Sequence, residues 1–385
     1  MKDIPEAGRS QHIAEILKPY HTIALVLQGG GALGAYQAGV FEALHEAGIS
    51  ASWLSGVSIG AINAAIIAGN KPGDQVDRLR DFWETVSKRK VWAFTPEGDI
   101  FRRWRNQHSA LMTMTAGLPG FFAPRQTNPW FAMAGAAGAT SFYDTAELEI
   151  TLNRLVDWRI VNNGERRLSV GAVNVATGNF RYFDSALEEL DARHVMASGA
   201  LPPAFPPVEI DNDFYWDGGI VSNTPLQYLL EQDTLRDTLA FQIDLFSARG
   251  ALPRDMGAVM TRHKDIMYSS RTRNNTDTFR RLHNLNLRLH DALLKVPEAD
   301  RSVEEKAFLH QMEDVPQINI VHLIYQPRIY ESDAKDYEFS GMSMREHWAS
   351  GYRDTVRTLQ HRPWLEKPPE CVGMTVHDIH RDDPT

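Results

Sequence analysis

The sequence predicts an α/β protein with three layers, in which helices cover both faces of a central, mostly parallel sheet. Two observations lead to this prediction. Short apolar runs alternate with helical patterns from the first strand onward, as in βαβ units. The runs are also almost continuously apolar, as in TIALVL at 22–27 and LAFQIDLF at 239–246, which is typical of parallel strands buried on both faces.

The first seventy residues have the clearest pattern. The strand at 22–27 is followed by a helix whose apolar residues recur at helical spacing, and Gly48 stands where a left-handed cap ends such a helix. A second strand at 51–54 leads into an alanine-rich helix at about 60–68. We therefore expect β-α-β-α at the start of the fold.

The rest of the chain is less regular. Further strands are expected at 168–178, 180–184, 214–219, 239–246 and 318–326, with a long polar and basic helical region at about 255–313. Residues 92–140 are expected to form loops with short helices. The predicted organisation is an N-terminal segment at 1–21, a catalytic domain at 22–230, strands and helices that extend it at 231–362, and a poorly packed polar tail at 363–385.

Composition excludes several classes of protein. The 385 residues carry a net charge of -9, which argues against a nucleic-acid-binding protein with a basic surface. The single cysteine, Cys371, permits no intrachain disulfide and no zinc site built on several cysteines. The first residues lack the apolar core of a secretory signal, and no apolar run approaches the length of a membrane span. We expect a cytoplasmic protein that can at most lie against a bilayer.

Residues 56–60, GVSIG, match the G-x-S-x-G pattern of a nucleophile elbow. Gly56 and Gly60 let the backbone crowd together at a strand-to-helix turn, while the hydroxyl of Ser58 stands clear. The pentapeptide alone is weak, but here it lies between a predicted strand and a predicted helix. Ser58 is therefore a candidate nucleophile.

A second glycine cluster, GGGALG at 29–34, directly follows the first strand. Gly29, Gly31 and Gly34 satisfy the dinucleotide-binding pattern G-x-G-x-x-G, which requires an acidic residue about 20 positions later to hold a ribose. The chain has Ser55–Ser58 there instead. The alternative is an oxyanion site, since glycine amides at a helix N-terminus can donate to an anion. Neighbouring parallel strands would place this loop beside Ser58.

A serine nucleophile needs a base. His322 could follow Asp217 in the chain order Ser, acid, His of an α/β-hydrolase, but only one βαβ unit precedes Ser58, which is too little for that fold. Asp217, in the segment DGG that closes the apolar strand FYW, is the better candidate. Residue chemistry alone does not connect it to Ser58.

Four segments in order resemble the patatin-like phospholipases: GGGALG at 29–34, GVSIG at 56–60, ASGALPPAFPPV at 197–208 and DGGIVSNTPL at 217–226. The resemblance covers about 22–230. One departure is Leu33, where many members carry Lys or Arg. The segments HLIYQP, KDYEFS and SMREHWASGY within 322–352 look like the C-terminal extension of a bacterial subgroup.

The resemblance implies a serine lipid acyl hydrolase with a Ser-Asp dyad and without histidine. Ser58 would be the nucleophile and Asp217 the base, with Gly56 and Gly60 in the elbow. The implied oxyanion hole is Gly29, Gly30, Gly31 and Ala32, and the implied supporting glycines are Gly34, Gly218 and Gly219. No cofactor or metal is required, and the partner would be a lipid or another acyl ester.

Several alternatives stay open on sequence alone. The same site could serve an acyltransferase or a hydrolase of short hydroxyalkanoate esters, and a nucleotide-binding protein remains a contrasting class. The apolar span 108–140 could be an acyl-binding wall, a lid that meets the membrane, or ordinary packing. The basic stretch that includes Arg280, Arg281 and Arg288 could touch lipid phosphates or form a solvated helix face.

Overall fold

The computed structural model describes residues 13–88, 99–136, 138–232, 236–312, 315–328, 330–331, 334–369 and 373–382. The strands are β1 (Thr22–Leu27), β2 (Trp53–Gly56), β3 (Ala123–Pro124), β4 (Tyr143–Asp144), β5 (Arg167–Asn174), β6 (Phe180–Asp184), β7 (Val208–Ile210), β8 (Asp213–Asp217), β9 (Thr238–Asp244), β10 (Ile318–Ile324) and β11 (Met374–Asp378). The α-helices are α2 (Ala35–Glu46), α3 (Ile59–Ala68), α4 (Gln75–Val86), α5 (Asp99–Ala116), α6 (Ala146–Leu155), α7 (Trp158–Asn162), α8 (Ala192–Ser198), α9 (Leu226–Leu230), α10 (Met256–Leu293), α11 (Val303–Gln311), α12 (Gly341–Gln360) and α13 (Ile379–Asp382).

Short 3-10 helices complete the description: η1 (Gly31–Gly34), η2 (Pro129–Phe131), η3 (Gly218–Ile220), η4 (Glu298–Asp300), η5 (Lys335–Tyr337) and η6 (Arg362–Leu365). Two of them, η1 and η3, lie at the ends of β1 and β8. Both therefore stand where sequence reasoning places the glycine loop and the candidate base.

One mostly parallel sheet forms the middle of the fold. Among the described residues it has nine strands, in the order β11-β10-β9-β1-β2-β5-β8-β7, with β6 also paired to β5. The pairs from β11 to β5 along this order are parallel, and those that involve β6, β7 and β8 are antiparallel. The C-terminal strands thus extend the sheet directly from β1.

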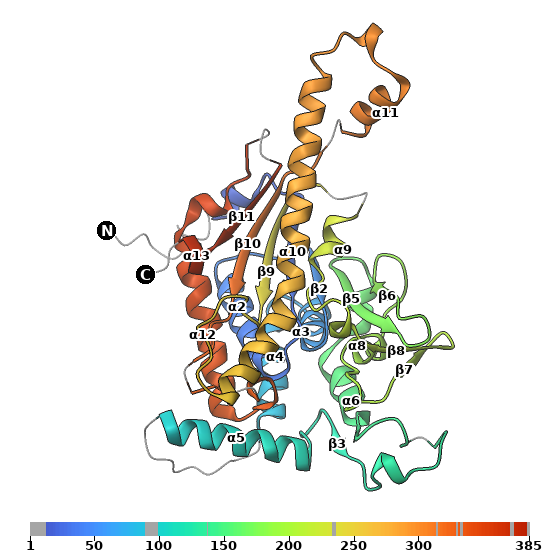
Figure 1. The fold of residues 1–385 in the computed structure, drawn as a ribbon, viewed down its shortest axis with the longest axis vertical. Coiled ribbons are helices and arrows are strands. Elements are labelled where there is room, and N and C mark those ends of the chain that lie inside the picture. Colours follow the sequence, from blue (N-terminus) through green and yellow to red (C-terminus); the bar gives the residue numbers. More distant parts are fainter. Residues whose placement is uncertain are drawn as a thin grey trace.

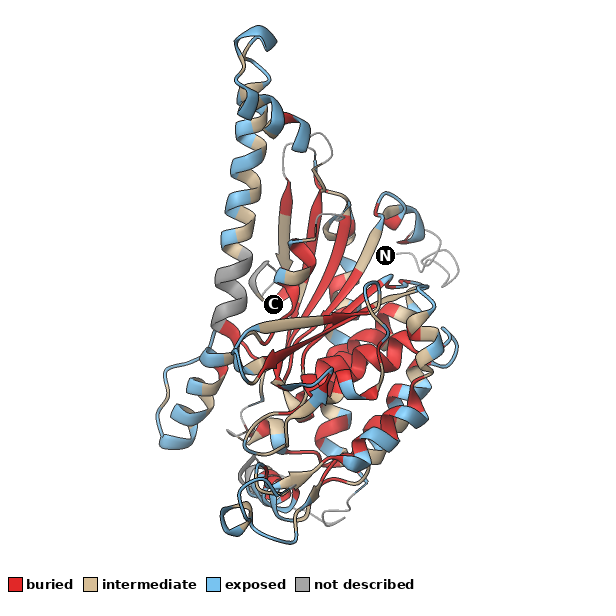
Figure 2. Ribbon diagram, turned by 90° about the vertical axis from the view of Figure 1, so that its right-hand side faces the viewer, coloured by how far each residue is buried: buried red, intermediate tan, exposed pale blue. Residues whose placement is uncertain are grey.

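Helices cover both faces of this sheet, so the predicted three layers are confirmed (Figure 1). Side chains alternate along β1: Leu25 and Leu27 join the core beneath α2, α3 and α12. Ala24 and Val26 join a second core with the apolar side chains of α9. Because both faces are covered, the strands are buried throughout their middle (Figure 2).

The C-terminal helix α12 packs directly on α2, the helix that follows the glycine loop. A Cβ added to Gly39 of α2 would stand 1.9 Å from the carbonyl oxygen of Trp348, and one added to Gly351 of α12 would stand 2.0 Å from that of Tyr36. Only residues without a side chain permit backbones this close. The C-terminal part of the chain is therefore built into the layer that supports the glycine loop.

Two expectations about irregular regions are wrong. Residues 99–116 form the single helix α5 rather than loops with short helices, whereas 92–98 lie outside the described residues. The helix was missed because its arginines and methionines obscure the apolar period. The segment after 363 is also packed: Leu365 is fully buried and β11 pairs with β10. The amide of Asn319 donates to the carbonyls of Trp364 and Glu366, which fixes this segment on the sheet.

Candidate active site

The predicted nucleophile elbow is present at the end of β2. Ser58 lies between β2 and α3 with a positive φ of 56°, a strained conformation for a residue with a side chain. A Cβ on Gly60 would stand 2.3 Å from the carbonyl oxygen of Leu27, and one on Gly56 would stand 2.4 Å from the backbone of Gly60. Both glycines are therefore required for α3 to start this close to β1.

Helix α8 holds the backbone of the elbow. The amide of Ser58 donates to both the carbonyl and the hydroxyl oxygen of Ser198, at 3.2 and 3.0 Å, and the Ser198 hydroxyl donates to the Gly171 carbonyl at 2.6 Å. Ser198 belongs to the segment ASGALPPAFPPV, whose role could not be derived from sequence. Its contact with Ser58 gives this segment a structural role at the site.

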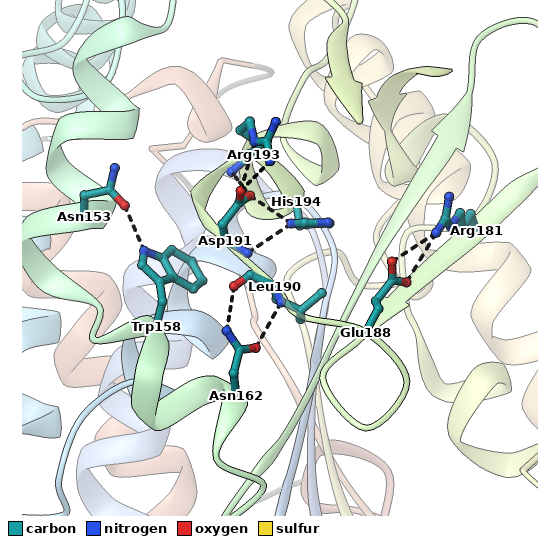
Figure 3. Close-up of polar contacts among 9 residues, drawn as sticks. All are labelled: Asn153, Trp158, Asn162, Arg181, Glu188, Leu190, Asp191, Arg193 and His194. Carbon is teal, nitrogen blue, oxygen red and sulfur yellow. Dashed lines mark hydrogen bonds and ion pairs between the residues drawn. The ribbon is translucent and has the colours of Figure 1, made fainter. Parts of the chain in front are cut away.

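The opposite end of α8 is fixed by a polar network (Figure 3). Asp191 and His194 form a capping box at the start of the helix, and Arg193 binds the same carboxylate at 2.7 Å. Asn162 exchanges two hydrogen bonds with the backbone of Leu190, each at 2.9 Å. Capping satisfies the free amides of a helix start. The network therefore fixes the helix that ends beneath Ser58.

The structure brings Asp217 to Ser58. Asp217 closes β8 and is 1% exposed. Its Oδ1 accepts a hydrogen bond of 2.7 Å from the Gly219 amide, and Asp217 and Ser58 line the same cavity. Burial raises the pKa of Asp217 to about 6, although the Gly219 amide and the Ser58 hydroxyl both act to lower it. Of the supporting glycines, Gly218 lies close to the carbonyl of Gly171 and lets β8 approach β5.

The glycine loop lies beside Ser58, as expected. A Cβ on Gly29 would stand 3.0 Å from the Cβ of Ser58. However, the amide of Gly29 donates to the carbonyl of Asn223 at 3.2 Å, and the side chain of Asn223 donates back to the Gly29 carbonyl at 3.0 Å. Gly29 is thus an anchor of the loop, and its amide is not free for an oxyanion.

The remaining candidate donors are in the next three residues. Gly30 and Gly31 line the cavity in front of Ser58, whereas Ala32 is 2% exposed and is absent from the described lining. The first amides of a helix have no intrahelical acceptor, and Gly31 begins η1. Gly30 and Gly31 are therefore better placed than Gly29 or Ala32 to donate to an oxyanion.

Leu33, the departure from the family pattern, is fully buried in the core. The loop consequently displays no cation at this position. Next to the glycine loop lies His347 of α12, which is buried and contacts Glu331. Burial opposes the charge on His347, but the hydrogen bond to Glu331 and the nearby carbonyl of Ala32 raise its pKa overall.

A cavity of about 310 Å³ opens in front of Ser58 and Asp217. One wall is an aromatic cluster from separate parts of the chain: Phe121, Phe122, Tyr143, Phe205 and Phe339. Ile59 and Ile62 of α3 continue it. The described lining contains no histidine, lysine or arginine. His322 is instead bonded to Asp244 at 2.7 Å, so it is not placed to act as a base here.

Asp217 is shielded from water by residues from separate parts of the chain. Phe205, within the proline-rich run at 202–207, does line the cavity, but Phe214 is 47% exposed and neither it nor Trp216 is part of the described lining. Two further residues line the cavity: Phe246, which follows β9, and Tyr268, which lies on α10. Neither was predicted from the sequence. Because these two residues are distant from Asp217 along the chain, no local sequence pattern identifies them.

The C-terminal extension supplies the remaining wall. Asp336 and Tyr337 of η5 line the cavity, and Asp336 is bound by Lys264 of α10 at 2.7 Å. Next to this pair, Lys335 binds Asp265 at 2.6 Å with both side chains buried. The segment KDYEFS is therefore the part of the C-terminal extension that reaches the site.

Two other regions, the apolar span 108–140 and the basic stretch of α10, had more than one possible role. Within 108–140, Phe121 and Phe122 belong to the cavity wall, whereas Trp130, Phe131 and Met133 are exposed. On α10, Arg280 pairs with Asp277 at 3.0 Å, and Arg281 and Arg288 are exposed. Among the described residues, no helix is long and apolar enough to span a membrane and no acidic, histidine and cysteine cluster could hold a metal.

The fold and the site define an α/β protein with a strained serine elbow, a glycine loop and a buried carboxylate at one end of a parallel sheet. The sequence model described as Patatin-like phospholipase matches residues 25–230, more than half of the chain. The chain therefore belongs to the patatin-like phospholipase family, and the resemblance found in the sequence is confirmed. A second model, described as Patatin phospholipase, matches residues 266–371 and so covers the C-terminal extension.

Individual relatives match only in part. The lysophospholipase NTE1 of Cryptococcus neoformans var. neoformans serotype D is 27% identical over 235 residues, which are 61% of this chain and 12% of that protein. The neuropathy target esterase sws of Drosophila melanogaster is 27% identical over 208 residues, or 53% of this chain and 12% of that protein. The chain thus spans 12% of the length of these two curated relatives.

Solved structures that the chain matches include human GIVD cytosolic phospholipase A2, which is 12% identical. The match covers 93% of this chain and 63% of that chain, with a TM-score of 0.43. VipD from Legionella pneumophila is 15% identical, with coverages of 89% and 67% and a TM-score of 0.39.

Proposed function

We propose that this chain hydrolyses carboxylic esters of lipids, with Ser58 as the nucleophile and Asp217 as the only side-chain base. The observation that supports this best is that Ser58 and the buried carboxylate of Asp217 line one cavity beside a glycine loop. Membership of the patatin-like phospholipase family agrees with it. The names of the relatives, a lysophospholipase and an esterase, point to the same class of substrate.

The reaction has two steps. Asp217 accepts the hydroxyl proton of Ser58 while Oγ attacks the ester carbonyl carbon. The bond to the alcohol oxygen then breaks, and Asp217 returns the proton to that oxygen. In the second step Asp217 takes a proton from water, whose oxygen attacks the acyl group on Ser58. The acid leaves, and Ser58 recovers its proton.

Both steps pass through a tetrahedral oxyanion. The amides of Gly30 and Gly31 are the candidate donors to this oxygen. Loss of one such donor in related chemistry lowers kcat by about 100- to 1000-fold. The strained backbone at Ser58 holds its side chain at the elbow before substrate arrives, so little reorganisation is needed during the reaction.

The cavity suits an acyl chain better than a charged group. Its aromatic wall can pack along methylene groups, and its described lining presents two carboxylates, Asp217 and Asp336, but no cation. A phosphate placed deep inside would meet the carboxylate of Asp217, and the described lining offers it no cation. We therefore place the acyl chain inside the cavity and any phosphate head group at its mouth.

Active-site labelling tests the assignment. A fluorophosphonate should attach to Ser58, located by peptide mapping, and Ser58→Ala should abolish both labelling and ester hydrolysis. Asp217→Asn should abolish hydrolysis, whereas His322→Ala should retain most of it. Labelling at another residue, or full activity of either dyad variant, would contradict the proposal. Product analysis with an added alcohol would show whether water or the alcohol receives the acyl group.

A further inference from the structure

The segment 100–143 has an unusual charge distribution for this chain. Acidic residues make up 49 of 385 positions overall, about one in eight, yet none occurs between 100 and 143. The same segment contains four arginines, Arg102, Arg103, Arg105 and Arg125. A chain with a net charge of -9 would repel anionic surfaces through most of its exterior. This segment adds no negative charge of its own.

The segment also exposes large apolar side chains. Trp130, Phe131 and Met133 are more than four-fifths exposed, and Leu111 of α5 is 53% exposed. The turn that carries these aromatic residues is ordered. The side-chain oxygen of Asn128 accepts a hydrogen bond of 3.1 Å from the Trp130 amide and caps the start of η2. Adjacent exposed aromatic residues mark an interaction site on a protein surface.

This surface adjoins the mouth of the cavity. Phe122 and Tyr143, which line the cavity, flank the segment 123–142 and are in ring contact at 4.8 Å. The Tyr143 hydroxyl donates to the carbonyl of Met114 at 2.6 Å, and Met114 both lines the cavity and is 44% exposed. In Figure 1, α5 and the segment around β3 lie together at one end of the molecule.

We propose that this rim surface, made of the exposed side of α5 at 111–114 and the turn at 128–133, docks on a phospholipid bilayer and lets an acyl chain enter the cavity. The proposal rests on the proposed function and names the surface from which its substrate comes. Tryptophan and phenylalanine favour the boundary between head groups and acyl chains. The absence of acidic residues removes repulsion from the phosphates of the head groups.

Apolar insertion, rather than positive charge, carries this docking. Arg125 is paired with Asp144 at 3.0 Å, and Arg102 is paired with Glu346. These two arginines already have carboxylate partners, so binding should depend only weakly on salt. A second copy of the chain could also cover the apolar side chains, but it would then cover Met114, which lines the cavity.

Vesicle binding tests the proposal without interference from hydrolysis. In the Ser58→Ala chain, the added changes Trp130→Ser and Phe131→Ser should weaken sedimentation with phosphatidylcholine vesicles by at least about tenfold. Val303→Ser and Leu187→Ser are matched controls, since these side chains are 80% and 76% exposed elsewhere. Neither control should change binding.

The catalytically intact chain gives the second readout. The double change at 130 and 131 should lower hydrolysis of ester lipid in vesicles by a similar factor, and leave hydrolysis of a soluble butyrate ester unchanged. Equal vesicle binding by parent and double variant would overturn docking, as would a dimer that the double variant alone loses. Vesicle binding with no ester hydrolysis by the parent would support docking and refute the proposed function.

Discussion

The carbonyl oxygen of Asp336 lies directly against the α-carbon of Gly31. A Cβ added to Gly31 would stand 2.2 Å from that oxygen, and the glycine has a φ of +56°. Gly31 belongs to the first family motif and Asp336 to the C-terminal extension, so the two matched regions, 25–230 and 266–371, meet at the glycine loop. The extension is therefore part of the structure that holds the candidate oxyanion donors.

Gly31→Ala should abolish most activity because the loop must move away from Asp336 to accommodate the methyl group. We expect kcat for a soluble ester to fall at least about 100-fold, as when an oxyanion donor is lost. Steady-state kinetics measures this directly.

Gly164→Ala is the control for backbone strain. Gly164 also has a positive φ, +82°, but nothing lies within 4 Å of an added Cβ. This variant should lose only about 1–2 kcal/mol of stability and keep its activity. Equal activity losses in both variants would show that strain, not the contact with Asp336, is responsible.

Hydrolysis should require ionised Asp217 and therefore respond to pH. Burial raises the pKa of Asp217 to about 6, although the Gly219 amide and the Ser58 hydroxyl act to lower it. Below that value kcat/KM for a neutral soluble ester should fall about tenfold per pH unit, since only the carboxylate accepts the serine proton. A pH-rate profile checks this. An acidic limb centred near pH 4 would contradict a buried base.

The same carboxylate should lower the stability of the fold at neutral pH. Its folded pKa, about 6, exceeds the ordinary value of about 3.9. Between these values the folded state binds more protons, so stability falls as pH rises from about 4 to about 6 and stays lower above. Asp217→Asn removes this loss and should stabilise the fold at pH 7.5 by on the order of 3 kcal/mol.

Urea denaturation at two pH values measures that effect. The gain in Asp217→Asn should shrink as the pH falls to about 4 and disappear below about pH 3, where the parent carboxyl is protonated in both states. A variant that is inactive and less stable than the parent at pH 7.5 would argue that Asp217 is mainly structural.

Lys335→Met should destabilise the C-terminal wall of the cavity. The change leaves Asp265 buried without its partner, which typically costs about 3–5 kcal/mol. The denaturation midpoint should therefore drop sharply, and fluorophosphonate labelling of Ser58 should slow because η5 is released. Replacing Asp265 by leucine in the same chain should recover part of the stability.

An exposed ion pair provides the comparison. Arg159 pairs with Asp157 at 2.8 Å, but its side chain is 91% exposed. Solvent and salt screen such a pair, so Arg159→Met should change the denaturation midpoint little. A similar drop in both variants would contradict a special role for the buried pair.

The strand-to-helix turn at 56–60 could be predicted because its geometry requires a local sequence. Gly56, Ser58 and Gly60 stand together because a tight strand-to-helix turn needs small residues at fixed spacing. The glycine loop at 29–34 is equally local. Helix α5 was missed because its arginines and methionines obscure the apolar period, and β11 was missed because its burial depends on neighbours that are distant in the chain.

By itself, the sequence determined the order of strands and helices around the first two motifs, the elbow and the family. Only the tertiary structure decided that the carbonyl of Asn223 accepts the hydrogen bond of the Gly29 amide, and that residues of α10 and η5 complete the cavity wall. The physical reason is the range of the interactions. Turns and caps are set by adjacent residues, whereas packing and buried ion pairs join residues that only the folded chain brings into contact.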